Sequence, residues 1–183
     1  MSSPASANPP WCVPIEVAEI SETGRRFAIV ADAHTRDAVA KLAAVPALPR
    51  LTAEFELTRY GHDGVRVVGS VSATVEQNCV ATLEPMQTEV EEEIDLLFEP
   101  PQTGPPGATH PSERERQDEE SEVLRDGVVD LGAVATEFLI LGIDPYPRKE
   151  GAVFNAPIPK EDLADRPFAA LAALKKDKPR QDR

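Results

Sequence analysis

The stretch LTAEFELT, residues 51–58, decides the fold class of this 183-residue chain. Its apolar residues Leu51, Ala53, Phe55 and Leu57 alternate strictly with threonine and glutamate. Successive side chains of a strand point to opposite faces, so this period of two predicts a strand with one buried face and one wet face. Sheets with one wet face are antiparallel, and partner strands with the same alternation are therefore expected nearby.

Two further alternating runs follow and complete an antiparallel meander. The first, SVSATVE at residues 70–76, is joined to residues 51–58 through His62-Asp63-Gly64, because an Asp-Gly pair supplies the positive φ of a tight hairpin turn. The second run occupies residues 90–98. Its large apolar residues are predicted to face the core (Ile94, Leu96 and Phe98) and its acids to face solvent (Glu91, Glu93 and Asp95).

Shorter elements are predicted before this meander. Residues 13–17 alternate as a strand, and residues 26–31 form a second short apolar run. A helix is predicted next, with Thr35 as its N-cap and with apolar residues at helical spacing. Pro46 and Pro49 are expected to end that helix.

Two more helices are predicted in the second half of the chain. Asp130 is the expected N-cap of the first, and Pro145 and Pro147 end it. Its core-facing residues recur at helical spacing: Leu131, Val134, Ala135, Phe138, Leu139 and Gly142. The second spans residues 165–176 and carries a narrow apolar stripe that includes Phe168. The sequence therefore predicts an α+β fold, in which an antiparallel β-sheet, an open meander or a barrel-like one, packs against two or three helices.

Composition divides the chain into a domain and its flanks. Residues 1–11 are predicted to be a flexible N-terminus, residues 12–176 a single domain, and residues 177–183 a basic C-terminal tail. Residues 99–122 carry five prolines, many charges and no large aliphatic side chain. Such a segment cannot bury enough apolar surface to offset an ordering entropy of roughly 1–2 kcal/mol per residue, so we expect a disordered acidic and proline-rich insert.

The totals restrict the partners and the compartment. The net charge is −13, which repels phosphate at long range and favours a basic partner, or RNA contacted through a local basic patch. The chain has no apolar run of about 18 residues that could span a bilayer, and its first residues lack the basic and apolar regions of a secretory signal. Its two cysteines form no disulfide framework. We expect a cytoplasmic protein.

Cys79 is the first residue to weigh as a site. A metal knuckle or redox pair of the Cys-x-x-Cys type needs a second cysteine at position 82, where the chain has Thr82. Cys12 is distant in sequence, and no histidine stands at ligand spacing to either cysteine. We therefore predict that Cys79 is a small, partly buried residue at a strand end. No metal, cofactor or catalytic residue is predicted anywhere in the chain.

Several carboxylates leave alternatives open. The run Glu89, Glu91, Glu92, Glu93 and Asp95 is typical of the solvated face of a strand, but a divalent-metal site for a hydrolase remains an alternative. Glu92 stands at a position of the strand whose side chain points inward. It either meets a basic side chain there or marks the point at which the strand leaves the core. Glu137 is either a solvated helix-edge residue or an anchor for a basic partner.

The C-terminal end is basic on an otherwise acidic protein. Its cations are Lys175, Lys176, Lys178, Arg180 and Arg183. They form either a plain soluble end or a short RNA contact in which each cation neutralises a phosphate.

The order of these segments resembles a known family. VEQNCVATLEPM, an acidic strand ending in LLFEP, a charged insert, VVDLGAVATEFLILGIDPYPR and RPFAALAALKK follow one another as in the YceD family, named for large ribosomal RNA subunit accumulation. The resemblance extends from about Pro14 to Lys176, and CVATLEP with PFAALAALKK is similar to the alphaproteobacterial branch. The positions that match the family pattern are Cys79, Asp130, Leu131, Glu137, Leu141, Pro145, Pro147 and Phe168.

The resemblance implies a bacterial, cytoplasmic, non-enzymatic factor in ribosome biogenesis that supports accumulation or processing of large-subunit ribosomal RNA. The implied partners are that RNA or a basic ribosomal protein, without a membrane or a small-molecule substrate. Many family members carry a second cysteine three residues after the first, and Thr82 in that place argues against a metal or redox role here. The alternatives are an acidic module for a non-ribosomal basic partner and, last, the carboxylate-metal hydrolase.

Overall fold

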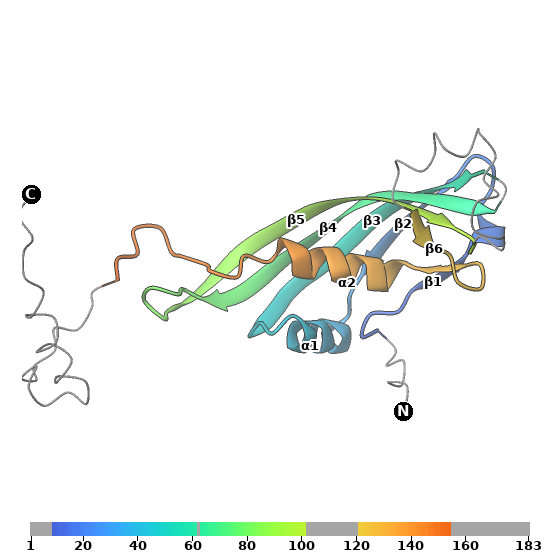
Figure 1. Cartoon of the computed structure of the whole chain (residues 1–183). Coiled ribbons are helices and arrows are strands. Elements are labelled where there is room, and N and C mark those ends of the chain that lie inside the picture. Colours follow the sequence, from blue (N-terminus) through green and yellow to red (C-terminus); the bar gives the residue numbers. More distant parts are fainter. Residues whose placement is uncertain (1–8, 62, 102–120, 155–183) are drawn as a thin grey trace, which may run out of the picture. The chain divides into compact units, whose positions relative to one another are not determined.

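A computed structural model describes residues 9–61, 63–101 and 121–154 of the chain (Figure 1). The contacts between residues group the chain into two compact units, the first of which ends at Ala152. Every described helix and strand belongs to this first unit. These elements are, in order, β1 (Pro14–Glu16), a 3-10 turn (Val17–Glu19), β2 (Arg25–Val30), α1 (Ala33–Leu42), β3 (Ala47–Tyr60), β4 (Gly64–Asn78), β5 (Pro85–Glu99), β6 (Ser121–Val123), β7 (Val128–Asp130) and α2 (Leu131–Gly142).

The main sheet has five strands in the order β2-β3-β4-β5-β6. The first four pair antiparallel in sequence order, which confirms the predicted meander and the α+β class. The sheet is open, so the barrel-like alternative is wrong. The short strand β6 pairs parallel with the end of β5 and makes the sheet mixed, a feature that the sequence did not indicate.

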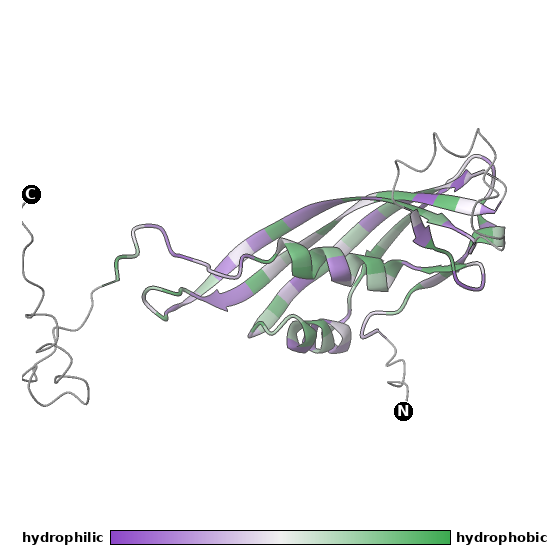
Figure 2. Ribbon diagram, viewed as in Figure 1, coloured by the Kyte–Doolittle hydropathy of each residue, from purple (hydrophilic) through white to green (hydrophobic). Residues whose placement is uncertain are grey.

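The register places the two faces of the sheet as the alternation predicts. Leu51 of β3 lies opposite Ala73 of β4, and Ala73 lies opposite Val90 of β5. All three are buried. Hydropathy alternates along the strands (Figure 2), and the buried residues of β3 and β4 are mostly apolar.

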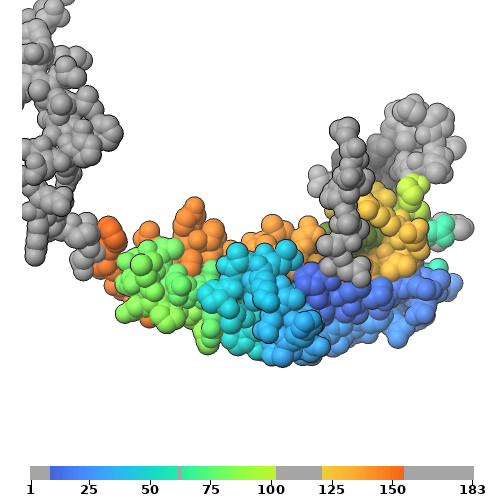
Figure 3. Space-filling view, turned by 90° about the horizontal axis from the view of Figure 1, so that it is seen from below, coloured from blue at the N-terminus to red at the C-terminus, as the bar shows by residue number. Residues whose placement is uncertain are grey.

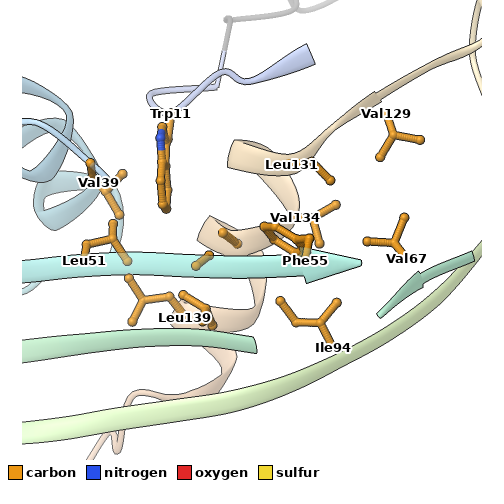
Figure 4. Close-up of a cluster of buried hydrophobic side chains, with 14 of the residues drawn as sticks. Trp11, Val39, Leu51, Phe55, Val67, Ile94, Val129, Leu131, Val134 and Leu139 are labelled. Atoms are coloured by element: carbon orange, nitrogen blue, oxygen red, sulfur yellow. The ribbon is translucent and has the colours of Figure 1, made fainter. Parts of the chain in front are cut away.

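Both described α-helices pack on the inner face of the sheet (Figure 1). Helix α1 contacts β3, and α2 contacts β4 and β5. Between the helices and the sheet lies one cluster of buried side chains, in which Trp11 lies near Val39 and Leu51 (Figure 4). Trp11 is buried although it belongs to the stretch predicted to be a flexible N-terminus. Residues 1–8 lie outside the described part of the chain.

Helix α1 begins earlier than the sequence predicts. Its N-cap is Asp32, whose carboxylate accepts a hydrogen bond of 2.7 Å from the Thr35 N–H, so Thr35 is not the cap but the donor to it. The helix ends at Leu42, before Pro46. Pro49 lies inside β3, at a register shift between Ala47 and Arg50, where a strand tolerates a residue without an N–H.

Helix α2 begins where the sequence predicts. The Asp130 carboxylate accepts hydrogen bonds from the N–H groups of Gly132 and Ala133, at 3.0 and 3.1 Å, which confirms it as the N-cap. The same oxygen accepts a third bond of 2.8 Å from the Val13 N–H. Asp130 therefore joins α2 to the two-stranded sheet of β1 and β7.

The remaining predicted elements fall wholly or partly outside the described residues. The insert predicted over residues 99–122 lies there except for its ends, where Glu99 closes β5 and Ser121 opens β6. The helix predicted over residues 165–176 and the basic tail also lie outside. Within the described residues, no helix is both long and apolar enough to cross a membrane.

Candidate functional site

Cys79 follows β4 directly and opens the tight loop that leads to β5. Its N–H donates to the Glu84 carbonyl at 2.9 Å, and its own carbonyl accepts from the Leu83 N–H at 2.8 Å. Leu83 turns the loop with a φ of +60°. The Cys79 side chain is fully buried.

A segment that follows α2 holds this loop in place. The Val80 N–H donates to the Pro147 carbonyl at 2.9 Å, and the Lys149 N–H donates to Cys79 Sγ at 3.4 Å. Lys149 Nζ also pairs with the Glu84 carboxylate at 2.8 Å, which lowers the pKa of Glu84. The chain after α2 is thus fastened to the β4–β5 hairpin loop at Cys79, Val80 and Glu84.

These hydrogen bonds change the chemistry of the thiol. The Thr82 hydroxyl and then the Lys149 main-chain N–H lower the pKa of Cys79 to about 6, against the opposing effect of burial. At neutral pH the thiolate is the favoured form. The interpretation of Cys79 as a small apolar residue agrees with its burial but missed this ionisation, because Thr82 and Lys149 meet the sulfur only in the folded loop.

No metal centre forms around the thiolate within the described residues. They contain no group of three histidine, cysteine, aspartate or glutamate side chains that could hold an ion. Thr82, at the position of the missing second cysteine, acts as a hydrogen-bond donor to the sulfur. Cys12 is exposed, and its hydrogen bond with Asp130 raises its pKa.

The outer face of the main sheet carries alternating charged side chains and is opposite both described helices. Its acids outnumber its bases. The acids are Glu54, Glu56, Glu76, Glu89, Glu91, Glu93 and Asp95, and the bases are Arg26, Arg50 and Arg66. The predicted solvated face of the carboxylate run in residues 89–95 is thus part of a larger acidic face.

Three ion pairs cross between strands on this acidic face. They are Arg26–Glu56 at 2.9 Å, Arg50–Glu89 at 2.6 Å and Arg66–Asp95 at 2.7 Å. The pKa of Asp95 is lowered by Arg66, and that of Glu89 by Thr74 and then Arg50. All six side chains are well exposed, so each pair adds only about 0–1 kcal/mol to stability.

Other acids of the face lack such partners. Among the described residues, no ion pair or side-chain hydrogen bond joins Glu54, Glu91 or Glu93 to the protein. Glu54 lies beside a depression of about 520 Å³ that Arg26, Ala28, Val68 and Ser70 also line. The face can therefore accept cations from outside.

Glu92 and Glu137 have separate positions. Glu92 points inward, as its parity predicts, and its side chain contacts Gly142 at the end of α2. It meets helix backbone there, and no basic side chain pairs with it among the described residues. Glu137 is exposed on α2, one turn before Leu141, which is 75% exposed.

Helix α2 is more apolar than an exposed helix usually is. Its outward residues Ala133, Glu137 and Leu141 separate two shallow grooves. One groove, of about 420 Å³, lies toward α1 and is lined by Pro9, Pro10 and Leu42 among others. Figure 3 shows α1 beside the N-terminal segment on this side of the molecule. The other groove, of about 330 Å³, lies toward β5 and β6.

The family-signature positions are not brought together into one site. Cys79 and Pro147 meet at the hairpin loop, and Asp130 and Leu131 begin α2. Glu137 and Leu141 are exposed on the same helix face, and Pro145 is exposed after it. Phe168 and the proposed RNA contacts Lys175, Lys176, Lys178, Arg180 and Arg183 lie outside the described residues.

Two residues of the loop region were missed by sequence reasoning. Lys149 carried no signal, because its contact with Cys79 spans 70 positions. Gln77 did carry a signal in the sequence. It is the next inward-pointing residue of the strand after Val71, Ala73 and Val75, and its side chain is polar. It is buried, and its Nε2 donates to the Asp144 carbonyl at 2.8 Å.

The described fold is that of an α+β domain with an open acidic sheet face and an apolar helical face. The family model for the large ribosomal RNA subunit accumulation protein YceD matches residues 67–175. The chain belongs to the YceD family, whose name links it to accumulation of large-subunit ribosomal RNA. The match begins inside β4, later than the resemblance from about Pro14 predicts. Comparisons with curated proteins and with solved structures gave no match.

Proposed function

We propose that this protein is a non-enzymatic cytoplasmic factor that supports accumulation of large-subunit ribosomal RNA by binding a basic ribosomal protein on the acidic face of its sheet. The observation that carries the proposal is the open sheet face of a YceD family member, on which Glu54, Glu91 and Glu93 lack partners within the described structure. Ribosomal proteins that bind RNA carry excess lysine and arginine, and an acidic face complements them.

The depression beside Glu54 supports this proposal. It lies where β2, β3 and β4 are adjacent and is open to solvent, with Glu54 and the Arg26–Glu56 ion pair on its border. An arginine or lysine side chain fits such a volume, with its apolar stem against Ala28 and Val68. The basic tail, residues 177–183, would add a salt-dependent contact with RNA.

The experiment is sedimentation of a lysate that contains the tagged protein, with and without nuclease. We expect the protein to travel with large-subunit precursors and, after nuclease treatment, to keep a basic ribosomal protein bound. A triple variant, Glu54→Gln with Glu91→Gln and Glu93→Gln, should lose that protein and lower large-subunit ribosomal RNA.

The matched control removes the same charge elsewhere. Glu16→Gln, Asp37→Asn and Glu150→Gln change three exposed acids outside the acidic face and should leave binding intact. Equal loss in both triple variants would mean that only net charge matters. Capture of non-ribosomal basic proteins alone would instead favour the interaction module without a ribosomal role.

A further inference from the structure

Strand β5 has an open edge. It pairs with β4 along almost its whole length, from Pro85 to Phe98. On its other side, β6 pairs only with residues 97–99, and no other described strand pairs with residues 85–96 (Figure 1). A long strand edge of this kind is a template on which another chain can form main-chain hydrogen bonds.

Charge restricts what can pair with this edge. Glu89, Glu91, Glu93 and Asp95 project from β5 on its outer face. Two copies of the chain that paired through β5 would bring these acids together, and like charges directly opposite each other are destabilising. The edge is therefore protected against self-association and selective for a strand with basic residues on the outer face.

The inner side of the same edge borders a groove with many apolar residues, although four charged residues also line it (Glu122, Arg125, Asp130 and Glu137). The groove of about 330 Å³ is lined by Leu96 and Phe98 of β5, Phe138 and Leu141 of α2, and Val123 of β6. Because β6 lies on the side of β5 away from β4, it borders this groove at the point where the unpaired part of the β5 edge begins. Leu141 and Val123 are 75% and 56% exposed there, although both are apolar.

These observations require one kind of occupant. A strand added beside β5 projects its side chains alternately to the two faces. Those on the outer face lie next to Glu89, Glu91 and Glu93, and those on the inner face reach the groove beside Leu141. We propose that the β5 edge binds an extended segment of a basic protein in which lysine or arginine alternates with apolar residues. This inference rests on the proposed function and names the form in which the basic partner is bound.

The test uses synthetic peptides and the full chain. The probe is a ten-residue peptide that alternates lysine or arginine with valine or isoleucine, and the control peptide has the same composition with its basic and apolar residues in two blocks. We expect micromolar binding of the alternating peptide, and slowed amide hydrogen exchange in residues 85–96. Equal binding of both peptides, or protection confined to other strands, would overturn the proposal.

Two variants test the two sides of the edge. Leu141→Asn should weaken the alternating peptide about tenfold because one apolar contact is lost, whereas Leu42→Asn, at an exposed leucine of α1 away from β5, should not. Glu91→Lys with Glu93→Lys should weaken it by more than about tenfold and should accept instead an alternating peptide with glutamate in place of its cations. Glu22→Lys with Glu150→Lys is the charge control.

The outcomes separate this inference from the proposed function. Ribosomal association that survives Leu141→Asn, in a protein that ignores both peptides, removes strand addition and leaves the proposed function standing. Peptide binding by a protein that does not associate with ribosomes supports strand addition and removes the proposed function. An RNA oligonucleotide that protects residues 85–96 in the same way, or a dimer that forms through β5, would overturn the choice of a basic protein segment.

Discussion

Glu92 of β5 and Gly142 of α2 are in direct contact, so close that a Cβ atom at residue 142 would overlap the Glu92 side chain. Glu92 is half-buried and lies between Val90 and Ile94 on the inner parity of its strand. Gly142 is the last residue of the helix that covers these residues. The missing side chain of one residue therefore makes room for the other, and the end of α2 can lie against β5.

This contact predicts an energetic coupling between the two positions. Alanine is normally better than glycine in a helix by about 1 kcal/mol, but Gly142→Ala must displace Glu92 and should give no gain, or a loss of about 1 kcal/mol. In a Glu92→Ala background the same change should stabilise the protein. Urea unfolding of the two single variants and the double variant measures the coupling, which we expect at about 0.5–2 kcal/mol. Additive effects would show that the two side chains do not compete for space.

A second prediction concerns the cap of α2. Asp130→Ala removes the acceptor of three main-chain N–H groups, those of Val13, Gly132 and Ala133. The loss of a cap and of a contact between distant segments should lower the free energy of unfolding by roughly 2–4 kcal/mol. Asp130→Asn keeps one carbonyl oxygen and should cost less. The comparison is Asp32→Ala in α1, where only the bonds to Thr35, from its N–H and its hydroxyl, are lost and about 1 kcal/mol is expected.

The alternation of residues 51–58 predicts both faces of β3, and Asp130 predicts the start of α2. Both predictions succeed because each pattern depends only on a few consecutive residues. The parallel pairing of β6 with β5 could not be predicted, because it depends on where the chain returns after residue 101. Thr35 was wrong as a cap because Asp32 also precedes a helical pattern, and the sequence does not decide between two oxygen-bearing residues three positions apart. Lys149 and Cys79 meet only through the folded hairpin, so the thiolate left no signal beyond a single cysteine.

A third prediction concerns Gly69 in the middle of β4. It lies opposite Phe55 of β3 and Ile94 of β5. A Cβ atom there would collide with the Glu54 carbonyl oxygen and lie 2.9 Å from Phe55 Cδ1. Because a backbone oxygen in a sheet cannot move aside as a flexible side chain does, Gly69→Ala should cost roughly 2–4 kcal/mol of unfolding free energy.

The neighbouring residue supplies the control for that measurement. Ser70 projects to the outer face of the sheet, where Ser70→Ala removes only a hydroxyl, and its effect should stay within about 0.5 kcal/mol. Thermal or urea unfolding of both variants is sufficient. Similar stability of the Gly69→Ala and Ser70→Ala proteins would mean that β3 and β4 do not approach each other as closely as the register requires.

The last prediction follows from the thiolate of Cys79. Its pKa is about 6 in the folded protein and 9.0 for an ordinary thiol, so between these values the unfolded chain binds more protons than the native one. Stability should therefore rise with pH across this window. The stabilisation by the Cys79 thiolate is fully present above about pH 9 and is lost as the pH falls toward 6.

Urea unfolding at a series of pH values measures this stabilisation, in a Cys12→Ser background so that only one thiol titrates. Cys79→Ser should abolish the rise in stability with pH. Thr82→Val removes the main hydrogen bond to the sulfur and should raise the lower limit of the window. Parallel pH profiles for the cysteine and serine proteins would mean that the buried sulfur stays protonated.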